Sequence, residues 1–277
     1  MRFTKMQGLG NDYVYLDCTQ RTPEDLPGLA RRLSDRHFGV GSDGLICICP
    51  SDRADFRMVM FNADGSQGEM CGNGIRCVGK FLYDKGLTDQ THLTIETPAG
   101  PRGLELQTEA GKVAAVTVDM GAPILDPAHI PVEDAGRDFI ARPMVVGGRA
   151  WKVTCLSMGN PHAVVFVPDV SRLPLAELGP AFEGHPSFPQ RINTEFVQVE
   201  NQNTLRMRVW ERGSGETLAC GTGACAALAA AVLNGYAGPA AAVVLPGGVL
   251  TIRWDRADGH IYLTGPAVTV FEGQWPD

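Results

Sequence analysis

The chain has 277 residues, of which 44% are hydrophobic and 20% charged, a composition typical of a globular protein with a full buried core. The formal net charge of −7 and the lack of a Lys/Arg run argue against binding to nucleic acid. The N-terminal segment lacks the apolar stretch of a signal peptide, and the longest uncharged apolar run, residues 223–233, is too short to cross a bilayer. We therefore expect a cytoplasmic protein with no membrane partner, whose eight cysteines are reduced thiols.

The first half of the chain predicts a helix that begins directly after a cysteine. Strand-like segments at residues 12–17 and 57–61 precede the sequence CGNGIRC at residues 71–77. The apolar residues that follow, Ile75, Val78, Phe81 and Leu82, have helical spacing, and Gly86 is a plausible end for the helix. Two further strands are predicted at residues 92–97 and 112–120.

The second half predicts the same arrangement. Strands at residues 162–167 and 205–210 precede CGTGAC at residues 220–225, and the run up to Leu233 is apolar on every side, which indicates a buried helix. Three strands are expected after it, at residues 241–246, 249–254 and 260–265. The segment 126–149, rich in Pro, Gly and Asp, is expected to connect the halves.

The two halves match under one ungapped shift, because the cysteines are 149 positions apart (220 − 71). The shift superposes Gly10-Asn11 on Gly159-Asn160, Arg57-Met58 on Arg206-Met207, and Cys71-Gly72 on Cys220-Gly221. We therefore predict an α/β (α+β) protein of two pseudo-symmetric domains, each a mixed sheet or barrel around a central helix, with the active site in the cleft between them. The expected domains are residues 1–119 and 120–277, with a C-terminal strand at about 266–277 that returns to the first.

Two thiols at helix N-termini suggest proton transfer on both faces of one carbon. The positive end of a helix lowers the pKa of a thiol, and its free N–H groups can stabilise a developing negative charge. One thiolate can remove an α-proton while the opposite thiol supplies a proton to the other face. The chain has no CxxC pair, Walker motif or GxGxxG motif, so we expect neither a metal nor a cofactor. Near the cysteines, Arg212 is suited to binding a carboxylate, and Glu211 and His162 to setting thiol protonation.

Six segments resemble the diaminopimelate epimerase family. They lie between Lys5 and Cys225 and read MQGLGNDY, FNADGS, EMCGNGIRC, MGNPHAVV, RINTEF and WERGSGETLACGTGAC. The resemblance implies an isomerase that interconverts LL- and meso-diaminopimelate without pyridoxal phosphate, for lysine and peptidoglycan biosynthesis. It implies that Cys71 and Cys220 are the acid/base thiols. One position departs from the pattern, because Gly44 stands where some members have a substrate-contacting Gln.

The resemblance also assigns roles around the two thiols. His162 and Glu211 resemble residues that modulate thiol protonation, and Glu211 is also placed among the substrate contacts. The remaining substrate-binding residues that it implies are Asn11, Asn62, Gly72, Asn73, Asn160, Asn193, Arg212, Gly221 and Thr222. We further expect a homodimer that acts on a small amino acid.

Two other functions are compatible with the same residues. A proline or hydroxyproline racemase would keep the fold and the two thiols but take a smaller substrate. A non-catalytic amino-acid-binding protein would use the same helix ends without proton transfer. Taken singly, each Asn is usually a turn residue, and His162 could be purely structural. Cys77 and Cys225, inside the predicted helices, are expected only to pack.

Overall fold

The computed structural model describes residues 1–68, 70–133 and 136–276, and the chain forms two compact units. Unit 1 contains Met1–Asp119 together with the chain from Thr264 onward, and unit 2 contains Met120–Leu263. The chain therefore passes between the units twice, the second time within strand β17 (Ile261–Pro266). Asp277, at the end of the expected returning strand, lies outside the described residues.

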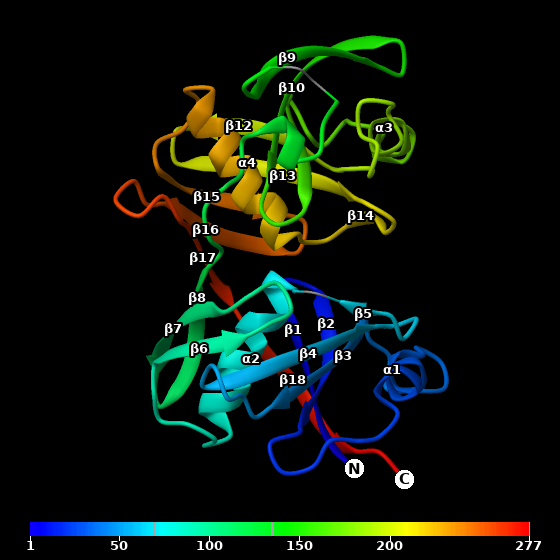
Figure 1. Cartoon of the computed structure of the whole chain (residues 1–277), viewed down its shortest axis with the longest axis vertical. Helices are drawn as coiled ribbons and strands as arrows, with labels where there is room; N and C mark the ends of the chain where they lie inside the picture. The colour runs from blue at the N-terminus through cyan, green and yellow to red at the C-terminus, as the bar shows by residue number, and fades with distance from the viewer. Residues whose placement is uncertain (69, 134–135, 277) are drawn as a thin grey trace. The chain divides into compact units, whose positions relative to one another are not determined.

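Unit 1 is a curved mixed sheet with the helix α2 (Gly72–Asp84) packed along its inner face (Figure 1). Its neighbouring strands run in the order β18-β1-β2-β3-β4-β6-β7-β8; β2 and β3 are parallel, as are β4 and β6, and the other pairs are antiparallel. The strands are β1 (Arg2–Gly8), β2 (Asn11–Asp17), β3 (Gly44–Cys49), β4 (Phe56–Asn62), β6 (His92–Glu96), β7 (Arg102–Glu109), β8 (Lys112–Asp119) and β18 (Val268–Gln274), with β5 (Gln67–Gly68) added beside β4.

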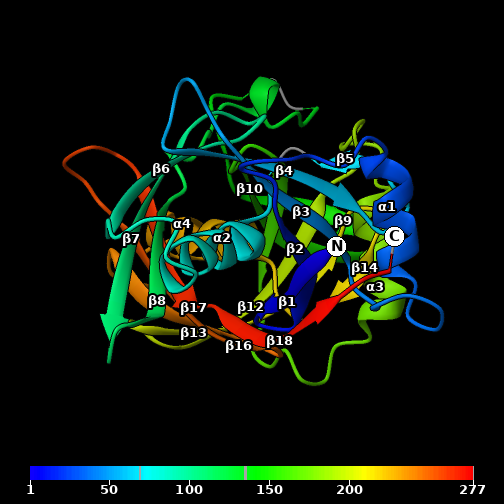
Figure 2. The ribbon, with the colours of Figure 1, turned by 90° about the horizontal axis from the view of Figure 1, so that it is seen from below.

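The two chain ends of unit 1 lie side by side (Figures 1 and 2). Strand β18 pairs with β1, and the amino group of Met1 donates to the carbonyl oxygen of Trp275 at 2.6 Å. A second helix, α1 (Leu26–Ser34), covers the outer face of β3. Its Leu29 and Leu33 pack against Leu45 and Cys47, so the sheet is buried on both faces here, which explains why all of β3 is buried.

Unit 2 repeats the arrangement around helix α4 (Gly221–Leu233), which Figure 1 shows among its strands. The order is β9-β10-β11-β12-β13-β15-β16, and the pairs β11-β12 and β13-β15 are parallel. The strands are β9 (Phe139–Val146), β10 (Arg149–Ser157), β11 (Pro161–Phe166), β12 (Asn193–Asn201), β13 (Thr204–Glu211), β15 (Ala240–Leu245) and β16 (Gly248–Trp254), with β14 (Gly215–Thr217) beside β13. Helix α3 (Leu175–Glu183) and the 3-10 turn Pro127–His129 complete the unit.

The duplication extends to the strand register. Tyr13 on β2 pairs with Gly44 on β3, and His162 on β11 pairs with Asn193 on β12, so both partners are related by the same 149-residue shift. Both helices bury almost their whole length because strands surround them. The predicted fold class, a mixed α/β structure repeated around two central helices, is confirmed.

The expected connecting segment is in fact part of unit 2. Residues 139–146 form strand β9, which pairs with β10, and Phe139, Met144 and Val146 lie in the core beside Trp151. The richness of this segment in Pro, Gly and Asp concealed a strand with one buried face. The passages between the units lie instead at residues 119–120 and 263–264. Asp134 and Ala135 within the segment lie outside the described residues.

Candidate functional sites at the two helix caps

Cys71 is the N-cap residue of α2. Its backbone is extended (φ −134°, ψ 113°), and its Sγ accepts a hydrogen bond from the Gly74 N–H at 3.3 Å. The Cys71 thiol in turn donates to Oδ1 of Asn11 at 3.2 Å. Asp43 fixes that amide, because its Oδ2 accepts from Asn11 Nδ2 at 2.8 Å. The thiol therefore lies at the positive end of the helix with a defined acceptor beside it.

The other expected residues of unit 1 differ in their surroundings. Asn73 is buried, and its Oδ1 accepts from Arg76 at 3.0 Å, so it stabilises the first turn of α2. Gly72 is the first residue of the helix and is buried. Asn62, the last residue of β4, is exposed and donates to Ser66 Oγ at 2.9 Å across the turn that follows the strand.

Gly44 is required by its neighbours. A Cβ at this position would lie 2.1 Å from the carbonyl oxygen of Phe61 and 2.8 Å from Cε1 of Tyr13. The Tyr13 ring therefore occupies the space in which a side chain at position 44 would begin. Its hydroxyl interacts with the Asn11 and Cys71 side chains, and burial raises the pKa of this phenol well above its usual range. Tyr13 is thus an additional neighbour of the Cys71 thiol.

Cys220 caps α4 in the same conformation (φ −126°, ψ 113°), and its Sγ accepts from the Gly223 N–H at 3.4 Å. Gly221 and Thr222 are the first two helical residues, and Thr222 Oγ1 lies 3.5 Å from the sulfur. Burial raises the pKa of the Cys220 thiol well above its usual range, and the carboxylates of Glu211 and Glu195 raise it further. These surroundings therefore favour the neutral thiol of Cys220 over the thiolate.

His162 lies within unit 2 between two polar side chains and is fully buried. Its Nε2 is 2.9 Å from Oδ1 of Asn160, and its Nδ1 is 2.7 Å from Oε1 of Glu195. Asn160 is also linked to the helix cap, because its Nδ2 donates to Thr222 Oγ1 at 3.3 Å. The structure therefore joins three predicted residues, Asn160, His162 and Thr222, in one hydrogen-bonded group.

Glu211 is the last residue of strand β13, and Arg212 follows it. The Glu211 carboxylate accepts from the Thr217 hydroxyl, and burial raises the pKa of Glu211 above its usual value. The exposed Arg212 side chain donates to the Gln190 carbonyl oxygen at 3.0 Å. Asn193 positions this turn, because its Oδ1 accepts from the Arg212 N–H at 2.8 Å while its Nδ2 donates to the Pro161 carbonyl oxygen at 3.0 Å.

Sequence reasoning missed Tyr13 and Glu195. Tyr13 carried a usable signal, because the 149-residue shift places it on His162. The same shift places Ile46 on Glu195, and these two residues lie beneath equivalent glycines of the caps. A Cβ at Gly74 would lie 2.7 Å from Ile46 Cδ1, and a Cβ at Gly223 would lie 2.7 Å from Glu195 Oε1. The unit 1 thiol therefore has an apolar neighbour where the unit 2 thiol has a carboxylate.

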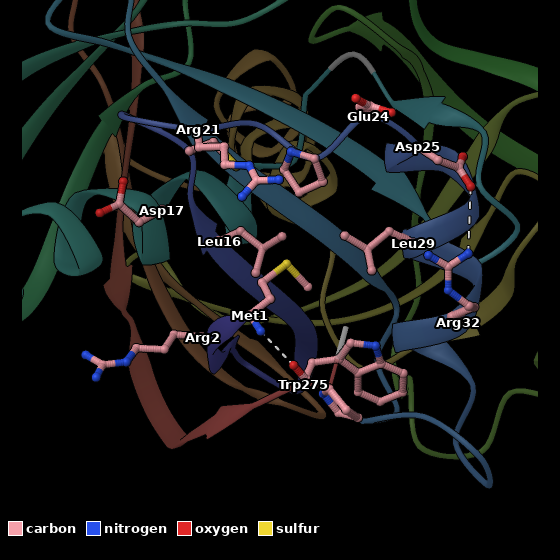
Figure 3. Close-up of a pocket in the computed structure, with 13 residues that line it drawn as sticks. Met1, Arg2, Leu16, Asp17, Arg21, Glu24, Asp25, Leu29, Arg32 and Trp275 are labelled. Carbon is pink, nitrogen blue, oxygen red and sulfur yellow. Dashed lines mark hydrogen bonds and ion pairs between the residues drawn. The ribbon is translucent and has the colours of Figure 1, made fainter.

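Other features lie apart from the caps. Unit 1 contains a pocket of about 660 Å³ lined by α1, the end of β2 and Trp275 (Figure 3), and none of the predicted site residues lines it. Within residues 1–68, 70–133 and 136–276, no group of three or more His, Cys, Asp or Glu side chains could hold a metal ion. Every helix within the same ranges is too short or too polar to span a lipid bilayer.

Comparison with known proteins places the whole chain in one group. A family model described as diaminopimelate epimerase matches residues 3–125 and 154–270. The diaminopimelate epimerase of Acetivibrio thermocellus is 57% identical over 274 residues, covering 99% of this chain and 98% of that protein. The diaminopimelate epimerase of Methanococcus maripaludis is 56% identical and covers 99% of each chain.

Solved structures of lower identity share the fold. A phenazine biosynthesis protein of the PhzF family from Bacillus anthracis matches with a TM-score of 0.70 at 18% identity, over 99% of this chain and 98% of that chain. A hydroxyproline epimerase from Agrobacterium vitis, solved with bound trans-4-hydroxy-L-proline, matches with a TM-score of 0.68 at 16% identity, over 99% and 90%. At these identities the likeness concerns the fold alone.

Proposed function

Because the chain belongs to the diaminopimelate epimerase family and is therefore an isomerase, we propose that it interconverts LL- and meso-diaminopimelate with Cys71 and Cys220 as acid/base thiols. Its substrate is a small molecule. The observation that carries the proposal is the repeated cap, in which each cysteine has the same backbone conformation and accepts an N–H from the third residue beyond it.

The chemistry follows from the two caps. Each unit contributes one thiol, at the N-terminus of its central helix. One thiolate removes the α-proton of the substrate, and the opposite thiol delivers a proton to the other face. Cys220, whose surroundings favour the neutral thiol, supplies that proton in one direction of the reaction. N–H groups of the first helical turns stabilise the negative charge that develops on the substrate carboxylate.

The surrounding side chains hold the two ends of the substrate. Arg212 is exposed at the turn that Asn193 positions, which suits it to bind a carboxylate. Glu211 and His162 lie beside Cys220 and set the protonation of its thiol. The remaining proposed contacts are Asn11, Asn62, Asn73 and Asn160, together with the helix-end residues Gly72, Gly221 and Thr222.

The proposal is tested by epimerisation in deuterium oxide. LL-diaminopimelate should gain one solvent deuterium at the inverted α-carbon, whereas an amino-acid-binding protein would leave that carbon unlabelled. Cys71→Ala and Cys220→Ala should each abolish epimerisation. Cys225→Ala is a matched control, because Cys225 lies inside α4, beyond the N-cap Cys220, and is not among the proposed substrate contacts. Full activity in either cap variant, or faster turnover of L-proline, would refute the assignment.

We propose further that the protein acts in the cytoplasm as a homodimer and needs neither pyridoxal phosphate nor a metal. Light scattering during gel filtration measures the oligomeric state, and a monomer would contradict the dimer. Turnover should survive dialysis against a chelator. Loss of activity that zinc restores would contradict cofactor independence.

A further inference from the structure

A continuous series of hydrogen-bonded side chains joins Glu195 to the Cys220 thiol within unit 2. Glu195 Oε1 lies 2.7 Å from Nδ1 of His162, whose Nε2 lies 2.9 Å from Oδ1 of Asn160. Nδ2 of Asn160 donates to Thr222 Oγ1 at 3.3 Å, and Thr222 Oγ1 lies 3.5 Å from Cys220 Sγ. We call these five residues the Glu195 relay.

The hydrogen bonds of the relay all point one way, because each side chain from His162 to Thr222 can donate a hydrogen to the next residue toward Cys220. We call this order of donors and acceptors the direction of the relay. The Asn160 oxygen can only accept, so the Nε2 atom of His162 must carry a hydrogen. The other ring nitrogen and the Glu195 carboxylate then share a single proton across 2.7 Å. Whether that proton lies on nitrogen or on oxygen, the His162–Glu195 pair carries no net charge. Glu195 is thus the hydrogen-bond partner of His162 Nδ1, and Nε2 of the same ring remains the donor to Asn160.

The direction reaches the sulfur through Thr222. Its oxygen accepts from Asn160, so its own hydrogen is available to the Cys220 sulfur. A donor to sulfur stabilises the thiolate, which burial and the neighbouring carboxylates disfavour. The ionisable group that faces Cys220 and His162 from strand β13 is Glu211, which the Thr217 hydroxyl also contacts.

Packing alone does not account for a carboxylate at position 195. Glu195 is fully buried, and its Oε2 has no hydrogen-bond partner among the described residues. A half-satisfied buried carboxylate is costly to the fold. In unit 1 the equivalent position beneath the cap holds the apolar Ile46, so this site in the fold accepts an aliphatic side chain.

We propose that Glu195 is a positioning residue for the reaction: by fixing the direction of the relay, it directs the Thr222 hydroxyl hydrogen to Cys220 and so assists proton transfer at that thiol. The role in the reaction rests on the proposed function. The effect on the Cys220 thiol does not, and it can be measured without substrate.

The test compares Glu195→Gln with Glu195→Ile in a Cys71→Ala background. A Gln side-chain amide can donate to Nδ1 and preserve the direction of the relay, whereas Ile, the residue of the equivalent site, cannot. Glu200→Gln is the matched control, because Glu200 lies on the same strand in a partly exposed ion pair with Arg206. The probe is iodoacetamide, and the rate of alkylation of the Cys220 peptide is followed by mass spectrometry between pH 7 and 10.

We expect Glu195→Ile to slow alkylation of Cys220 roughly 10-fold, the effect of one lost hydrogen bond to a charged group, while Glu195→Gln and Glu200→Gln stay near the parent rate. If Glu195 acts on the thiol as an isolated negative charge, both substitutions at 195 will accelerate alkylation, which would overturn the proposal. The proposal would also be overturned if Cys220 were alkylated at the same rate in Glu195→Ile and Glu195→Gln, whether at the parent rate or more slowly. Thr222→Val removes the last link and must slow alkylation similarly, which keeps the test decisive if the Ile variant does not fold.

In the protein that retains Cys71, kcat/KM for epimerisation should be far lower for Glu195→Ile than for Glu195→Gln. An alkylation pattern as expected in a protein without epimerase activity would refute the proposed function but not the relay.

Discussion

Replacing Gly223 by Ala should destabilise the protein, although the same substitution in a helix ordinarily stabilises it. Gly223 lies in the first turn of α4, and an added Cβ would lie 2.7 Å from Glu195 Oε1 and 3.2 Å from Cys220 Sγ. The carboxylate is fully buried and cannot swing into solvent. The new methyl group must therefore displace it from His162.

The net effect can be worked out from two opposing contributions. Ala in place of Gly stabilises a helix by about 0.5–1 kcal/mol. Separating a buried, charge-assisted pair such as His162 and Glu195 costs about 1.5–3 kcal/mol. We therefore expect a net loss of about 0.5–2.5 kcal/mol, which corresponds to a fall in Tm of roughly 1–10 °C at about 2–4 °C per kcal/mol.

Thermal unfolding followed by circular dichroism measures this change. Gly238→Ala is the control, since Gly238 has no atom within 4 Å of an added Cβ and should change stability by less than about 0.5 kcal/mol. In a Glu195→Ala background, Gly223→Ala should become neutral or stabilising, because the obstructing carboxylate is gone. If Gly223→Ala raises the Tm of the otherwise unchanged protein, the buried pair does not resist the methyl group and the reasoning fails.

Two further substitutions probe the caps. Tyr13→Phe removes a hydroxyl that interacts with Cys71 and Asn11 but keeps the ring against Gly44. We expect kcat/KM to fall about 2- to 10-fold, the range for one hydrogen bond, at unchanged Tm. An unchanged kcat/KM would exclude a role for the hydroxyl. Glu211→Gln removes a negative charge that raises the pKa of Cys220, so the onset of Cys220 alkylation by iodoacetamide should move to lower pH. A shift to higher pH would mean that Glu211 stabilises the thiolate instead.

The sequence predicted the architecture well because the duplication is visible without coordinates. A single shift of 149 aligns the cysteines, the glycines after them and the asparagines at residues 11 and 160, and the strand registers follow the same shift. The helices after Cys71 and Cys220 were predictable from local signals, namely apolar spacing in α2 and an unbroken apolar run in α4.

The peripheral elements were harder to predict. Helices α1 and α3 are only nine residues each, and α3 contains Pro180, so neither presents a long periodic pattern. Strand β9 is hidden by a composition typical of loops. These elements form because they cover apolar surface that the central strands present, which is a tertiary effect.

The sequence by itself determined the two caps, because a cysteine followed by glycines before an apolar helix is a local pattern that appears twice. Only the tertiary structure decided what surrounds each thiol. Glu195 and Ile46 occupy equivalent places beneath the caps, yet each is 25 residues before its cysteine (220 − 195 and 71 − 46), within a buried strand that reads as ordinary core. Side chains distant in sequence meet only when strands pair in register, so the asymmetry between the two thiols is a property of the folded units.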